Sequence, residues 1–203
     1  KPNPKSNNLD LLSINEILCL MNEEDNSIPA KIRKNIPLIT KLINNIVGNI
    51  NKGGRIFYVG CGTSGRLGVL DASECPPTFS VDSSLVQGII AGGDSALIKS
   101  IEYAEDSFEE GQKQIYLNNI NSNDSVIGIS ANGDAKFVHG ALTSAKKTKA
   151  LTSLITFNEI DELRYVDYLI ITILGPEIIS GSTRLKAGTA TKMILNMIST
   201  STM

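Results

Sequence analysis

Residues 55–79, RIFYVGCGTSGRLGVLDASECPPTF, contain the pattern that decides the fold. The apolar run at 56–59 predicts a buried strand, residues 60–65 form a turn rich in glycine and hydroxyl side chains, and a helix is expected to follow. This order builds an anion site, because glycine lets the backbone approach closely and amides at a helix N-terminus point at the anion. We expect a phosphate at this turn, with the Thr63 and Ser64 hydroxyls as additional donors.

Glu74 is the first candidate for a catalytic side chain. It is expected to lie beyond this helix, just before Pro76 and Pro77. Two prolines restrict the backbone after the carboxylate, so its side chain should be held rigidly near the phosphate turn.

The three glycines also fit a second interpretation. Gly60, Gly62 and Gly65 have the G-x-G-x-x-G spacing of dinucleotide-binding folds. That interpretation requires an acidic residue at the end of the next strand, and Asp82 lies near that region without a clear strand leading to it. The turn is not a P-loop, because no Lys-Ser/Thr pair follows the glycines. The hydroxyl side chains between the second and third glycines favour a phosphate monoester over a pyrophosphate.

The composition excludes several classes of partner. The chain has 203 residues, is 41% hydrophobic and 20% charged, and carries a formal net charge of −2. This charge gives neither a basic field for nucleic acid nor a polybasic patch for a membrane, and no apolar segment approaches the length that spans a bilayer. Three irregularly spaced cysteines and one histidine fit a reducing cytoplasm and leave little material for a zinc site.

Apolar runs alternate with helical patterns along the rest of the chain. Strands are predicted at residues 56–59, 86–90, 126–130, 151–157 and 168–173. This alternation predicts an α/β fold with a doubly wound, mainly parallel five-stranded sheet flanked by helices. Ligands of such folds bind at the turns that follow the strands, which here are residues 61–65, 91–93, 131–133 and 175–183.

Residues 1–52 predict an N-terminal helical segment that packs on the sheet domain formed by residues 53–203. The stretch Ser13–Glu16 has the spacing of a capping box, and isoleucines then recur at helical spacing from Ile32 to Ile50. Pro37 is expected to kink or interrupt that long helix. The chain starts without methionine and stops inside an apolar helical pattern, so we expect it to be part of a longer protein.

Several strings of residues resemble one known enzyme family. GCGTSGRLGVLDASECPPTF, IAGG, AEDS and GPEIISGSTRLKAGTATKMILNMIST are similar to the N-acetylmuramic acid 6-phosphate etherases, which have the sugar isomerase (SIS) fold that binds phosphosugars. The likeness runs from about Leu9 to Met203. Members of the family have a C-terminal helical part that is absent here.

The resemblance implies a lyase that cleaves the D-lactyl ether of N-acetylmuramic acid 6-phosphate to N-acetylglucosamine 6-phosphate and D-lactate. It points to Glu74, in SECPP, as the proton donor and to Glu105, in AEDS, as the second catalytic carboxylate. A base at C2 and an acid at the ether oxygen allow elimination, after which water adds to the alkene. We expect both carboxylates to face one pocket. The resemblance also implies a homodimer in the cytoplasm, with no metal or organic cofactor.

The turns and the resemblance together select the residues expected to bind the phosphorylated amino sugar. They are Gly62, Thr63, Ser64, Gly65, Arg66, Asn132, Gly133, Ser180, Ser182, Thr183 and Lys186. One turn departs from the family: the etherases have A-S-G-R-T-P-Y where this chain has ANGDAKF at 131–137. Asn132 replaces a serine expected to contact phosphate, and Asp134 replaces an arginine. The Asn132 amide can still donate, but the departure puts substrate affinity in question.

Two other groups with the same fold leave alternatives open. Glucokinase regulatory proteins share a GTSGR-type turn, lack the ECPPTF string, and act as non-catalytic binders that respond to phosphosugars. Sugar phosphate isomerases share the fold but not the paired glutamates. A regulatory binder is therefore the alternative to an etherase.

Overall fold

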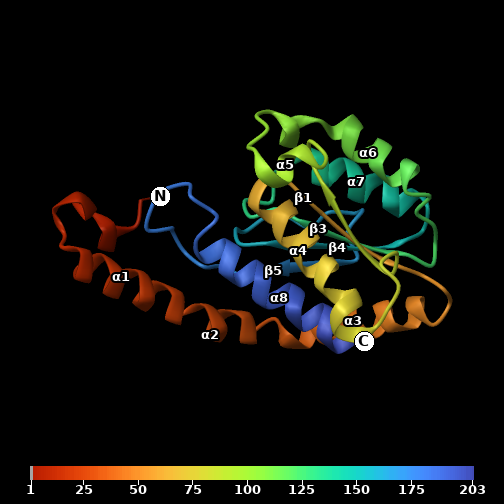
Figure 1. The fold of residues 1–203 in the computed structure, drawn as a ribbon, viewed down its shortest axis with the longest axis horizontal. Coiled ribbons are helices and arrows are strands. Elements are labelled where there is room, and N and C mark those ends of the chain that lie inside the picture. Colours follow the sequence, from red (N-terminus) through yellow and green to blue (C-terminus); the bar gives the residue numbers. More distant parts are fainter. Residues whose placement is uncertain (1) are drawn as a thin grey trace.

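The computed structural model describes residues 2–203, and its centre is one parallel β-sheet (Figure 1). Its strands are β1 (Ile56–Gly60), β2 (Val86–Ile90), β3 (Ser125–Ile129), β4 (Leu151–Thr156) and β5 (Tyr168–Ile171). They lie in the order β2-β1-β3-β4-β5, and every neighbouring pair is parallel. The predicted doubly wound five-stranded sheet is confirmed.

The strand order places a switch point between β1 and β3. From β1 the chain passes through α4 (Gly62–Phe79) to the edge strand β2, whereas from β3 it passes through α7 (Lys136–Lys147) to β4 on the other side. Connections that diverge in this way leave a crevice at the carboxyl ends of the two strands, where ligands of such sheets bind. The turns after β1 and β3 are therefore the first place to search for a site.

Helices cover both faces of the sheet (Figure 1). On one face lie α2 (Ile28–Arg33), α3 (Ile36–Ile50), α4 and α8 (Lys186–Thr202), and on the other lie α6 (Phe108–Leu117) and α7. Alternate side chains of β1 separate the two cores, since Tyr58 belongs to the first and Phe57 and Val59 belong to the second. Burial on both faces explains why this strand is continuously apolar. Within the described part of the chain, no helix has the length and apolarity to cross a bilayer.

The N-terminal segment forms α1 (Ile14–Asn26), α2 and α3. The predicted capping box is confirmed: the Glu16 amide donates to the Ser13 hydroxyl, and the Glu16 carboxylate accepts from the Ser13 amide. The expected long helix is divided between Arg33 and Ile36, with Pro37 in the first turn of α3, where a missing N–H costs nothing. Pro37 therefore interrupts the helix.

A buried ion pair attaches α1 to the start of α8. Lys186 is only 3% exposed, and its ammonium group donates to Glu24 at 2.5 Å and to the carbonyl oxygen of Leu174 at 3.4 Å. The Asn3 amide and the Lys5 ammonium group bind the same carboxylate. Partial burial raises the pKa of Glu24, but these donors outweigh it and lower the pKa to about 2. Electrostatics thus fixes where α8 begins.

Replacing Glu24 by glutamine should destabilise the protein by about 3 kcal/mol near neutral pH, because the buried Lys186 ammonium loses its counter-charge. The folded-state pKa of about 2 lies below the ordinary value of 4.5. The carboxylate therefore contributes full stability above that ordinary value and loses it as pH falls toward about 2. Urea denaturation followed by circular dichroism should show this loss in the wild type and a shallower one in Glu24→Gln.

The matched control is Lys5→Ala, which removes the exposed partner of the same carboxylate. Exposed ion pairs contribute about 1 kcal/mol or less, so this variant should be nearly as stable as the wild type. Equal losses in Lys5→Ala and Glu24→Gln would contradict the importance of the buried pair.

Candidate functional site

The turn after β1 leads directly into α4. Gly62, the first residue of α4, has φ of +50°, a left-handed conformation that favours glycine. Gly65 is buried, and a Cβ atom there would lie 2.7 Å from the carbonyl oxygen of Gly60. The helix can therefore begin against the end of the strand. Its first N–H groups have no partner inside the helix and are available to an anion in the crevice.

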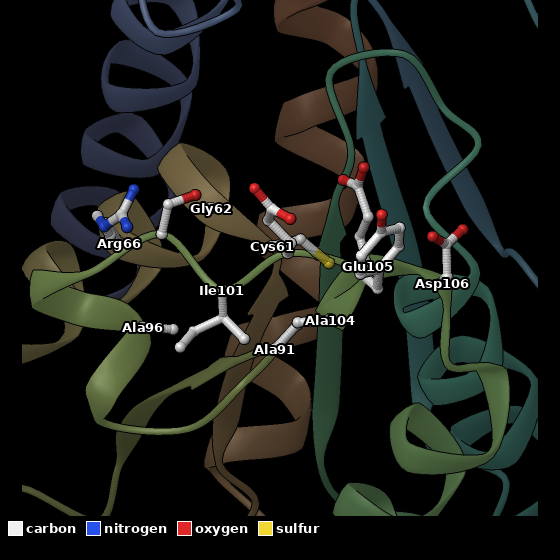
Figure 2. A pocket seen from close by; sticks show the side chains of 12 residues that line it. Cys61, Gly62, Arg66, Ala91, Ala96, Ile101, Ala104, Glu105 and Asp106 are labelled. Carbon is white, nitrogen blue, oxygen red and sulfur yellow. The ribbon is translucent and has the colours of Figure 1, made fainter.

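A cavity of about 560 Å³ lies beside this turn (Figure 2). Cys61, Gly62 and Arg66 line it from the turn, while Glu105 and Asp106 line it from the 3-10 helix Ala104–Asp106. Figure 2 shows Arg66 and Gly62 at one side of the view and the two acidic side chains at the other, with Cys61 between them. The fold thus brings Glu105 to the same cavity as the predicted phosphate turn.

The Cys61 thiol in this cavity keeps its proton. Burial, together with the negative charges of Glu105 and Asp106, raises its pKa to about 12. Because the thiolate is the nucleophilic form, the cavity offers carboxylate chemistry rather than thiolate chemistry.

Arg66 supports the wall of this cavity. Its guanidinium group donates to the carbonyl oxygens of Leu97 at 3.1 Å and Lys99 at 3.0 Å. These bonds attach α4 to α5 (Ser95–Ile98) and the residue after it. The predicted contact of Arg66 with a substrate stays a prediction, and it would have to use the other N–H groups of the side chain.

A second cavity, of about 330 Å³, joins two of the predicted binding turns. Asn132 lines it from the turn after β3, and Ser180 and Thr183 line it from the segment before α8. Gly133 is buried with φ of +82°, and its amide donates to the Ser130 hydroxyl, which fixes the turn. The half-buried Ser182 follows in the same segment but does not line the cavity.

The first turn also borders this segment. A Cβ atom on Gly188 of α8 would lie 3.6 Å from Cγ2 of Thr63 and 3.6 Å from the carbonyl oxygen of Thr183. Thr63 and the 180–183 turn are therefore neighbours across Gly188, and Ser64 is half-buried in the same first turn of α4. Predicted phosphate-binding groups from three turns thus converge beside the switch point.

Two polar residues that support these turns were not predicted from the sequence. The Glu177 carboxylate accepts from the amides of Lys186 and Ala187 and so caps α8. It lies nine and ten residues before those amides, outside the local spacing that identifies a helix cap. The His139 ring bonds the Gly133 carbonyl oxygen through Nε2 at 2.8 Å and the Tyr165 hydroxyl through Nδ1 at 2.9 Å, which holds the second turn.

Lys186 does not line either of these cavities, contrary to its predicted role at the phosphate. Its ammonium group is buried against Glu24 and the Leu174 carbonyl oxygen. A buried lysine requires a counter-charge, and here that charge lies 162 residues away in the sequence. No local pattern predicts such a pair.

The position of Glu74 also corrects the sequence-based expectation. Glu74 lies within α4, which continues through Pro76 and Pro77 to Phe79 and is followed by Ser80, where φ is +56°. Its exposed side chain lines a third cavity, between α4 and α8. By helical rise it is about 18 Å along α4 from Gly62.

Glu74 and Glu105 therefore line different cavities, and the expectation that they face one pocket is not met within a single chain.

The dinucleotide interpretation fails on geometry as well. Asp82 lies before β2, where it bonds the Ser84 amide, so it is at the opposite end of that strand from the phosphate turn.

Curated proteins of one family are similar to nearly the whole chain. N-acetylmuramic acid 6-phosphate etherase of Caldanaerobacter subterraneus subsp. tengcongensis is 53% identical over 202 residues, which cover 99% of this chain and 66% of the relative. The protein of the same name from Clostridium botulinum is 52% identical over 204 residues, which cover 100% of this chain and 68% of the relative. The chain thus spans about two thirds of the length of these relatives.

A family description and a solved structure agree on the fold. Residues 38–146 match the glucokinase regulatory protein N-terminal SIS domain. The structure of phosphoheptose isomerase GmhA from Neisseria gonorrhoeae superposes with a TM-score of 0.66 at 14% identity, covering 92% of this chain and 96% of that one. At this identity the likeness establishes the fold alone, and the predicted SIS fold is confirmed.

Iodoacetamide at about pH 8 should alkylate Cys19 quickly and Cys61 very slowly. Cys19 is exposed, whereas Cys61 is partly buried and has a pKa of about 12, so only about one Cys61 thiol in 10⁴ is ionised. Mass spectrometry of peptides over a time course measures both rates. The control is Cys19→Ser, which should lose the fast phase, and rapid native-state labelling of Cys61 would contradict the prediction.

Proposed function

The chain belongs to the N-acetylmuramic acid 6-phosphate etherase family, and from this membership we propose that the full-length protein cleaves the D-lactyl ether of N-acetylmuramic acid 6-phosphate. The products are N-acetylglucosamine 6-phosphate and D-lactate. The supporting observation is 52% identity to a named etherase over the whole chain. Membership in the family also supports a cytoplasmic role in amino sugar metabolism, in which this reaction recycles sugars from peptidoglycan.

We assign the substrate phosphate to the crevice where the three turns converge. The N-terminal amides of α4 and the hydroxyls of Thr63 and Ser64 supply donors on one side. On the other side, Asn132 accepts a hydrogen bond from Asn158 at 3.3 Å through its side-chain oxygen, which leaves its own amide group free to donate to phosphate. The Asp134 side chain is exposed, so its charge is screened by solvent.

The reaction requires one base and one acid. In the opened sugar the C2 hydrogen is α to the aldehyde, and Glu105, in the cavity beside the phosphate turn, removes it. Glu74 protonates the ether oxygen as the bond from C3 to that oxygen breaks, and D-lactate leaves. Water then adds across the new double bond, with its oxygen at C3 and a proton at C2, which gives N-acetylglucosamine 6-phosphate.

The separation of the two glutamates supports a site made from two copies of the chain. Glu74 and Glu105 line separate cavities, and Glu74 lies about 18 Å along α4 from Gly62, which borders the Glu105 cavity. The Glu74 side chain is exposed and makes no hydrogen bond or ion pair to another of the described residues 2–203, and Leu70, one turn before it, is 45% exposed. We therefore assign a homodimer in which Glu74 of one protomer completes the Glu105 cavity of the other.

A non-catalytic phosphosugar-responsive binder is the alternative, and the match of residues 38–146 to the regulatory protein domain favours it. Such a protein would bind the sugar phosphate without releasing D-lactate. The presence of Glu74 in the ECPPTF string argues for the etherase.

Incubation of the full-length protein with N-acetylmuramic acid 6-phosphate should release D-lactate, and each glutamate variant should lower turnover by about 10²–10⁴-fold. In deuterated water, Glu74→Gln should retain exchange at C2, since exchange requires only the base, whereas Glu105→Gln should lose it. Coupled D-lactate assays and NMR give the two rates. Exchange that survives only in Glu105→Gln would reverse the roles, and binding without D-lactate release would support the regulatory alternative.

Mixing the two inactive variants tests the shared site. After subunit exchange, half of the dimers are mixed and each mixed dimer has one intact site, so activity should return to about a quarter of the wild-type value. Activity that does not return after verified exchange would place both glutamates in one chain. A mixture of Glu74→Gln with Cys19→Ser,Glu74→Gln is the matched control and should stay inactive.

A further inference from the structure

The third cavity, about 270 Å³ between α4 and α8, contains none of the predicted phosphate-binding residues. Leucine side chains make up much of its wall, and its polar groups come from both helices. The lining residues are Leu67, Leu70, Asp71, Glu74, Lys192, Leu195 and Asn196. It is therefore a small, partly apolar pocket that places an ammonium group near the candidate acid.

Lys192 forms no direct ion pair with the carboxylates that line this pocket. Among the described residues, no carboxylate forms an ion pair with it. With the Asn196 amide oriented to satisfy its neighbours, the amide oxygen accepts from Lys192 at 3.0 Å and the nitrogen donates to Asp71 at 3.2 Å. Asn196 thus orients the ammonium group, which keeps donors free for a ligand.

Asp71 also lines the pocket, and it is bonded to Asn196 rather than to Lys192. Burial raises the pKa of Asp71, although the nearby Tyr58 hydroxyl, the hydrogen bond from Ser199 and the charge of Lys192 act in the opposite direction. One of its carboxylate oxygens is buried without a hydrogen-bond partner among the described residues. Among the lining residues Lys192 supplies the ammonium group, so it is the group that can pair with an anionic ligand.

We propose that this pocket binds the lactyl group of the substrate, with Lys192 paired to its carboxylate and the leucines around its methyl group. The proposal rests on the etherase function. In a lactyl ether, the carbon that carries the carboxylate and the methyl group is bonded to the ether oxygen. The groups that bind the carboxylate and protonate the oxygen must therefore line one small pocket, as Lys192 and Glu74 do.

This arrangement has two consequences for the reaction. The lactyl carboxylate would repel an ionised Glu74, and Lys192 offsets that negative charge. The sugar product lacks the lactyl group and loses this ion pair, so the pocket distinguishes the substrate from the product. D-lactate itself carries both the carboxylate and the methyl group and should bind here after the C–O bond breaks.

The test is Lys192→Met in the full-length protein, because methionine keeps most of the apolar stem and removes the charge. The KM for N-acetylmuramic acid 6-phosphate should rise about 10- to 100-fold, the effect of losing one charged hydrogen bond. Affinity for N-acetylglucosamine 6-phosphate, measured by calorimetry, should stay within about twofold, since that sugar does not reach Lys192. Lys192→Arg should recover much of the loss.

Lys147→Met is the matched control, because Lys147 is also an exposed helical lysine outside the ion pairs of the described chain. It should leave both ligands unaffected. A substrate whose lactyl carboxylate is converted to an amide adds a second control: it should bind less well to the wild type and show no further loss with Lys192→Met.

An unchanged KM in Lys192→Met, or an equal loss of affinity for both sugars, would overturn the proposal. The etherase function fails separately, if the wild type releases no D-lactate. Calorimetry with the two sugars then tests the proposed lactyl pocket separately. A preference for the lactyl sugar that depends on Lys192 supports the proposal, and the absence of that preference overturns it.

Discussion

The contact between the first turn of α4 and the end of β1 is the constraint on which the site depends. Gly65 lies so close to Gly60 that even a methyl group would meet the carbonyl oxygen at 2.7 Å. This close approach places the N-terminus of α4 against the end of β1, so that its free amides point into the crevice. The same contact fixes the position of the rest of α4. It therefore also determines where Arg66 supports the first cavity and where Glu74 lines the third.

The second constraint is the position of α8, which buried polar groups fix at its start. Lys186 pairs with Glu24 in α1, and Glu177 caps the amides of Lys186 and Ala187. Burying these groups is costly unless every partner is present. The pairs therefore hold α8 in one position, whereas apolar contacts alone would allow several. With α4 and α8 both fixed, one pair of helices borders the phosphate turns at one end and encloses the third cavity farther along.

The strands and the turns that follow them could be predicted because their signals are local. Apolar runs, glycine spacing and hydroxyl side chains are all present within a few neighbouring residues, as in 56–65. The Glu24–Lys186 pair and the Glu177 cap were missed because each joins segments that only the tertiary fold brings together. Glu74 was misplaced for a different reason: it was expected beyond the end of the helix, but α4 packs along the sheet and continues to Phe79.

Placing Glu74 and Glu105 in separate cavities has a chemical rationale for the proposed elimination. One carboxylate must accept a proton while the other donates one, and two carboxylates in a single pocket would couple their protonation. Here Glu105 neighbours Asp106 and the Cys61 thiol, whereas Glu74 neighbours Lys192 and leucine side chains. Different surroundings are how proteins give two carboxylates different roles. In the proposed dimer each environment is built within one protomer, and the two meet only around the sugar.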